Sequence, residues 1–152
     1  MASADITGND TRVKGVNSPN NYVQSEAHLL DGEEFAGILA ADTHDLFKIG
    51  AGNALTGLKV CALANTTSEG SATVQFKAKV GSGAAEAING TAIGKADLQA
   101  GDVVSIPVEK IKAYDGTDET LIQMTVGTAA LTAFKVLVVA EYIPVKQFIT
   151  AG

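Results

Sequence analysis

Apolar residues recur at every second position through much of this chain, and no window keeps a helical apolar stripe for three turns. Between Ser71 and Val80 the alternation is complete, with apolar residues at the even positions and Ser, Thr, Gln or Lys at the odd ones. Since neighbouring side chains of a strand point to opposite faces, this pattern predicts a half-buried antiparallel strand. Related patterns predict further strands at 55–64, 103–108 and 119–126, and shorter ones at 35–40 and 45–49.

The segment TAFKVLVVAEYIPVK, residues 132–146, is almost continuously apolar in its middle. It is too short for a membrane-spanning helix, which needs about 20 consecutive apolar residues. Three of its central residues are β-branched valines, and Pro144 follows closely. Both features favour a strand over a helix.

Both faces of this predicted strand are apolar at its centre. Phe134, Val136 and Val138 lie on the even face, which we expect to line the core. Leu137 and Val139 lie on the odd face. We therefore expect the odd face to be covered as well, by a loop of the same chain or by a neighbouring subunit. The same two-sided tendency appears in the segment KVCAL, residues 59–63.

About eight strands, separated by turn residues every ten or so positions, predict an all-β fold: a β-sandwich that is jelly-roll-like. Pro107 has no N–H to donate to a ladder, so its strand is expected at a sheet edge or a bulge. The sequence NTTSEG, residues 65–70, is predicted to be a hairpin loop. Residues 81–94 are predicted to form a long loop of small residues, and residues 95–100 a single helical turn.

The N-terminal part differs from the rest, because it is polar, rich in asparagine and only weakly periodic. Within it, only residues 11–16 and 21–28 look like strands. We therefore expect residues 1–34 to form an extended N-terminal arm, and residues 35–152 to form the β-sandwich domain with a short C-terminal tail. The tail, PVKQFITAG, carries Phe148 and Ile149, which need an apolar surface on the same or another subunit.

The charge balance narrows the function classes. The net charge is −6, from 17 acidic residues against 11 Lys and Arg. Such a surface repels phosphate backbones and anionic membranes, so neither nucleic acid nor a membrane is an expected partner. Cys61 is the only cysteine, which excludes an intrachain disulfide and a cysteine-based metal cage. The start, MASADITGND, has no secretory pattern, so we expect a soluble protein made in a reducing cytoplasm.

No group of residues carries a recognisable chemistry. The only histidines, His28 and His44, lie near Asp42 and Asp45, but adjacent residues of a strand point to opposite faces and a metal needs convergent ligands. The acidic loop at 115–119 lacks the order of a calcium-binding loop. The glycines match neither a phosphate-binding loop nor a nucleophile elbow. We predict no catalytic residue, no metal site, no cofactor and no enzymatic activity.

Three features together resemble the small decoration, or cement, proteins of tailed-bacteriophage heads. These are the polar start MASADITGND, the phrase KADLQAGDVVSIPV at residues 95–108, and the closing strand with its short tail. The resemblance covers most of the chain loosely. It implies a non-enzymatic structural virion protein that decorates and stabilises the outside of a capsid as an oligomer. It also implies a homotrimer bound to the major capsid protein, located at the capsid surface of the virion after synthesis in the host cytoplasm.

Two other functions fit the same sequence. One is another virion β-module, such as a tail or head-fibre component. The other is a carbohydrate-binding module, which generally uses exposed aromatic side chains; the chain has no Trp, and Tyr22 and Tyr114 are its isolated candidates. For the structural role, the residues expected at a subunit or capsid interface are Leu137, Val139, Phe148, Ile149, Tyr22 and Val23.

Overall fold

The computed structural model describes residues 23–112 and 118–144, with the side chains of 109–112 left aside; residues 1–22, 113–117 and 145–152 lie outside the described part. The described elements, in chain order, are β1 (Gln24–Asp31), η1 (Ala36–Leu39), β2 (Thr43–Ile49), β3 (Ala54–Ala62), β4 (Thr67–Ser68), β5 (Thr73–Val80), β6 (Glu86–Ala87), β7 (Ile93–Gly94), η2 (Lys95–Asp97), β8 (Val103–Lys112), β9 (Thr120–Gly127), β10 (Leu131–Ala133) and β11 (Lys135–Ile143).

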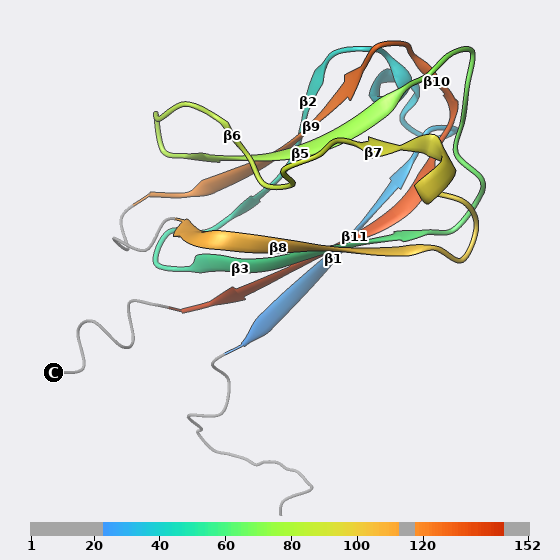
Figure 1. The fold of residues 1–152 in the computed structure, drawn as a ribbon. Helices are drawn as coiled ribbons and strands as arrows, with labels where there is room; N and C mark the ends of the chain where they lie inside the picture. Colours follow the sequence, from blue (N-terminus) through green and yellow to red (C-terminus); the bar gives the residue numbers. More distant parts are fainter. Residues whose placement is uncertain (1–22, 113–117, 145–152) are drawn as a thin grey trace, which may run out of the picture.

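The strands form two layers that pack face to face (Figure 1). Sheet A has the order β1-β11-β3-β8. Sheet B has the order β2-β9-β5-β6, with the short β7 also paired to β5. All pairings are antiparallel. The predicted all-β sandwich is therefore confirmed.

The pairing pattern is that of a jelly roll. With β6 and β7 counted as one strand beside β5, and the small β4–β10 pair set aside, eight strands remain in the two sheets. The first pairs with the eighth (β1·β11), the second with the seventh (β2·β9), the third with the sixth (β3·β8) and the fourth with the fifth (β5·β6). A long hairpin wrapped into two sheets has this order.

The core lies between the two sheets and contains the residues that the alternation placed there. Phe134, Val136 and Val138 are buried, and β11 is a central strand between β1 and β3. On the opposite layer, Phe76 and Met124 are fully buried neighbours on β5 and β9. These side chains belong to one continuous hydrophobic cluster that joins both sheets.

The segment predicted as a strand at 35–40 is instead the 3-10 turn η1, so that prediction was wrong. The backbone groups here find local partners: the N–H groups of Glu34 and Phe35 donate to the carbonyl of Asp31, and that of Ile38 donates to the carbonyl of Phe35. Because these bonds close within a few residues, the segment forms a turn and does not pair with a strand.

The hairpin predicted at residues 65–70 was also wrong. The strands that this segment links, β3 and β5, lie in different sheets, so the chain crosses from one layer to the other. Within the crossing, β4 pairs with β10 instead. An alternating pattern shows which face of a strand is buried, but it does not show which strand is the neighbour.

The long segment 81–94 is more ordered than a loop. It contains β6 and β7, and the buried Asn89 anchors it to sheet B. The Asn89 side-chain carbonyl accepts the N–H of Phe76 at 2.8 Å, and its amide donates to the carbonyl of Thr91 at 2.8 Å. The predicted helical turn after it is present as η2, and Gly101, with φ +94°, turns the chain into β8.

The edge position expected for Pro107 is confirmed, since β8 is an edge strand of sheet A. Ala62 and Asp102 form a hydrogen-bonded pair in the same register as Gly57 and Pro107. Even-numbered residues of β8 therefore bond to β3, and Pro107, an odd-numbered residue, faces away from the ladder. The proline costs sheet A no hydrogen bond.

The segment assigned to the N-terminal arm contributes to the sandwich. Residues 24–31 form β1, which pairs with β11 along its whole length. The described part of the sandwich thus begins ahead of residue 35, and residues 1–22 of the predicted arm lie outside the described residues.

Candidate functional site

The outer faces of the two sheets differ in chemistry. On sheet B, the outward side chains of β2, β9 and β5 are mostly polar and include only one leucine. They are Thr43, Asp45, Lys48, Thr73, Gln75, Lys77, Lys79, Leu121, Gln123 and Thr125. The outer face of sheet A is instead apolar at its centre, because several of its strands carry hydrophobic residues on both sides.

The apolar residues of sheet A align in one row across all four strands. Leu29 of β1 lies opposite Leu137 of β11. Leu137 in turn lies opposite Cys61 of β3, and Cys61 opposite Val103 of β8. With strands ~4.8 Å apart, this row spans ~14 Å. Four strands that are separate in the sequence are brought together here by the register of the jelly roll.

The row extends to two neighbouring positions. Val139 lies two residues along β11 from Leu137, and Leu63 lies two residues beyond Cys61. Leu29 is 46 % exposed, Leu63 50 % and Val103 62 %. We call these six residues the outer apolar patch: Leu29, Leu137, Cys61, Val103, Leu63 and Val139.

Ion pairs flank the patch on both sides. Lys135 and Asp31 lie opposite each other, two residues along their strands from the Leu29–Leu137 pair, with 3.9 Å between Nζ and Oδ2. On the other side, Lys59 Nζ lies 3.7 Å from Glu141 Oε2. An apolar centre with a charged rim is typical of protein–protein contact surfaces.

The structure places the predicted interface residues as follows. Leu137 and Val139 lie at the centre of the patch and are half-buried. Val23 precedes β1 and is 67 % exposed. The other three predicted interface residues lie outside the described residues; they are Tyr22, Phe148 and Ile149.

The sequence prediction missed Leu29 and Val103 as members of the patch. Each belongs to an apolar doublet, Leu29-Leu30 and Val103-Val104, within a strand. Leu30 is buried in the core, and Leu29 therefore points outward. An apolar doublet within a strand places one apolar side chain on each face, and this was the sequence signal that could have identified both residues.

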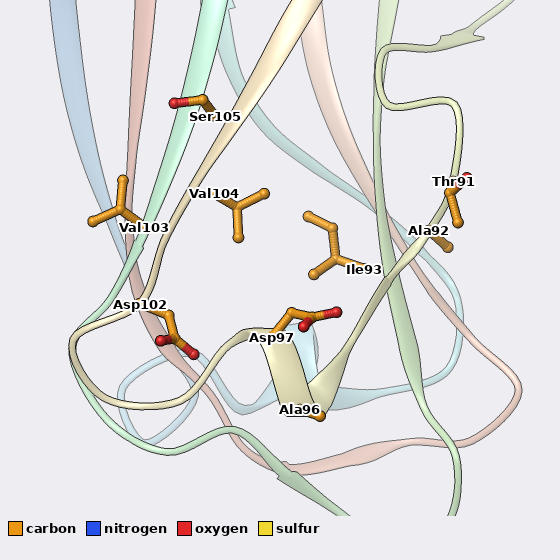
Figure 2. A pocket seen from close by; sticks show the side chains of 9 residues that line it. All are labelled: Thr91, Ala92, Ile93, Ala96, Asp97, Asp102, Val103, Val104 and Ser105. Carbon is orange, nitrogen blue, oxygen red and sulfur yellow. The ribbon is translucent and has the colours of Figure 1, made fainter.

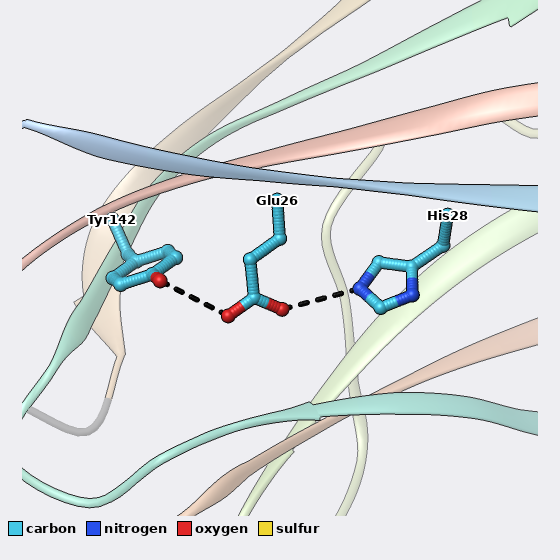
Figure 3. Close-up of polar contacts among 3 residues, drawn as sticks. All are labelled: Glu26, His28 and Tyr142. Atoms are coloured by element: carbon cyan, nitrogen blue, oxygen red, sulfur yellow. Dashed lines mark hydrogen bonds and ion pairs between the residues drawn. The ribbon is translucent and has the colours of Figure 1, made fainter.

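A polar network lies on the inner side of the edge strand β1 (Figure 3). The Tyr142 hydroxyl donates to Glu26 Oε2 at 3.0 Å, and His28 Nε2 lies 3.1 Å from Glu26 Oε1. The His28 ring also stacks on Phe47 of β2, with 3.9 Å between ring centroids. Burial raises the pKa of Tyr142, and the Glu26 carboxylate adds to this, so the phenol keeps its proton and remains a donor. The network joins the two sheets at this edge.

An open cleft of about 680 Å³ lies between β7, η2 and β8. Figure 2 shows Val104 on the side of Ile93 and Val103 on the opposite side of β8. The acidic side chains of the cleft are Asp97 and Asp102. Asp102 Oδ2 accepts the N–H of Gln99 at 2.9 Å, which holds the loop that leads into β8. Asp102 therefore has a structural role in this loop.

Comparisons with known proteins give no family. No protein-family model matches the chain, and no curated protein matches it. Among solved structures it is similar to a chain of the "Structure of infectious bursal disease virus Gx strain", with 14 % sequence identity and a TM-score of 0.42. The match covers 91 % of this chain and 38 % of that one, so the chain spans well under half of its neighbour's length. The fold assignment rests on the strand pairing of the chain itself.

The two histidines do not form one group with Asp42 and Asp45. His44 Nε2 lies 2.8 Å from the carbonyl oxygen of Ala40, whereas Asp45 accepts from the side chain of Gln123. Across residues 23–112 and 118–144, no group of three or more His, Cys, Asp or Glu side chains is placed to hold a metal ion. The described helical segments include none that is long and apolar enough to cross a membrane.

Proposed function

We propose that this protein is a non-enzymatic structural component of a virion, which decorates and stabilises the outside of a tailed-bacteriophage capsid as a homotrimer bound to the major capsid protein. The observation that carries the proposal is the contrast between the two outer faces of the sandwich. One face is polar, as solvent requires, and the other presents the outer apolar patch. The resemblance to decoration proteins supplies the partner.

The physical case for assembly begins with exposure. Several leucine and valine side chains of the patch are about half exposed and lie side by side within a charged rim. Covering them with a second surface removes apolar area from water, which is favourable. The described residues of the chain do not bury this face. Of the two coverings expected from the sequence, the proposal adopts the neighbouring subunit.

The fold suits a structural role. The two sheets share one continuous core, and the eight strands pair in a single jelly roll. A particle offers many copies of the same docking site, so an oligomer that binds through several subunits at once would be retained strongly even if each contact were modest.

The test uses the purified full-length chain and capsids of the phage or prophage that encodes it, prepared without this protein. Light scattering after size exclusion is expected to give three times the mass of the chain, and sedimentation is expected to recover the protein with the capsids. A monomer that stays in the supernatant would overturn the proposal. A trimer that binds immobilised glycans but not capsids would support the carbohydrate-binding alternative instead.

A further inference from the structure

The four sheet edges of the sandwich are protected unequally. Edge strands expose unpaired backbone groups, and proteins usually guard them with short strands, prolines or bulges. β8 carries Pro107 on its free side, β2 has a register shift between Asp45 and Phe47, and β6 and β7 are two residues long. β1 has eight residues in continuous register with β11, without proline, lysine or bulge.

The free side of β1 can be identified from one hydrogen bond. The N–H of Gly32 donates to the carbonyl of Phe134 at 2.7 Å, and these residues continue the register of β1 and β11. In an antiparallel ladder, hydrogen-bonded pairs recur at every second residue. Even-numbered residues of β1 therefore bond to β11, and the N–H and C=O groups of Ser25, Ala27 and Leu29 point away from it.

The side chains of β1 restrict what can pair with it. Glu26 and His28 are on the inner side, each with about a third of its side chain exposed. An inward charge at an edge normally discourages strand addition. Within the chain this carboxylate and imidazole already lie 3.1 Å apart, so a partner strand must present side chains that are compatible with both.

A second copy of β1 supplies this match. If two copies pair antiparallel about a two-fold axis through Ala27, the outward backbone groups of Ala27 face each other, and Ser25 faces Leu29 of the second copy. In that register Glu26 of each chain lies opposite His28 of the other, so each inward carboxylate meets an imidazole. If the axis passed through His28 instead, the two His28 side chains would face each other. Ser25 would then face Asp31 of the other copy, whose carbonyl already accepts two N–H groups.

We propose that β1 is a self-pairing edge, through which two copies of this chain join their A sheets in the register Ala27 to Ala27. The contact offers six backbone hydrogen bonds, from Ser25, Ala27 and Leu29 of each copy, but it buries little area. It is accordingly transient in dilute solution and persists where neighbouring copies are held side by side. It does not depend on the proposed capsid role.

Cysteine cross-linking tests both the contact and its register. In a Cys61→Ser background, Ala27→Cys places the two thiols on a pair with Cα atoms ~5.5 Å apart, within the range of a disulfide. Mild oxidation should link Ala27→Cys into covalent dimers. Ser25→Cys and Leu29→Cys are matched controls on the same exposed edge; each should stay unlinked alone, and an equimolar mixture of the two should link.

Hydrogen exchange of the uncross-linked chain gives a second, independent measurement. The amides of Ser25, Ala27 and Leu29 should become slower to exchange as protein concentration rises, whereas those of Glu26 and His28 should be protected throughout. Equal linking of Ala27→Cys and Ser25→Cys alone would overturn the register. An absence of linking in all variants, with exchange that does not depend on concentration, would overturn the contact. Neither result bears on capsid binding, which is measured separately.

Discussion

The double variant Leu63→Asp, Val103→Asp is expected to be a folded monomer. Both side chains belong to the outer apolar patch and are at least half exposed, so their replacement should change the free energy of unfolding by no more than about 0.5 kcal/mol each. In a covered patch, each aspartate would bury an unpaired carboxylate where an apolar side chain had packed. A loss of roughly 2 kcal/mol for each of the two residues, at about 1.4 kcal/mol per tenfold, weakens association by about 10³.

The matched control carries the same two added charges on the opposite face. Thr43→Asp with Thr73→Asp places them on the outer side of sheet B, which is polar. Light scattering should give the wild-type mass for this control and the mass of one chain for the patch variant, and circular dichroism should show both folded. A patch variant that keeps the wild-type mass would show that the outer face of sheet A is not the subunit interface.

Phe76→Ala should cause the largest loss of stability among single truncations of the core, about 3–5 kcal/mol. Phe76 is fully buried on β5, where it lies opposite Met124 and inside the cluster that joins both sheets. Its removal leaves a cavity that a rigid two-layer core fills poorly. Denaturant unfolding followed by circular dichroism measures the change.

Phe35→Ala is the matched control for this truncation. Phe35 is 54 % exposed at the start of η1, and the same substitution there should change stability by no more than about 0.5 kcal/mol. Similar losses at the two positions would mean that the core is not where the jelly-roll pairing places it.

Much of the fold could be predicted from the period-two pattern. The pattern identified β11 as a strand and placed Phe134, Val136 and Val138 in the core, because alternation directly reports which face is buried. It could not report which strands are neighbours, so the crossing between β3 and β5 was predicted as a hairpin. The turn η1 was missed for a related reason: its backbone bonds close locally, and residue type alone does not show that.

The candidate site was predictable only in part. Leu137 and Val139 stood out because their strand is apolar on both sides at its centre. Leu29 and Val103 belong to the patch only through the register that sets β1 beside β11 and β8 beside β3. A property created by pairing between distant segments has no local sequence signal, beyond the doublets in which these two residues occur.

The rate at which Cys61 of the wild-type protein reacts with a maleimide shows whether the outer apolar patch is covered in the oligomer. Cys61 is the only cysteine, and it lies in the middle of the patch, half-buried on the outer face of sheet A. If the patch is the subunit interface, alkylation should be several-fold slower at concentrations where light scattering shows the oligomer than after dilution to the monomer. Equal rates for the oligomer and the monomer would show that the patch stays open on assembly and is not the subunit interface.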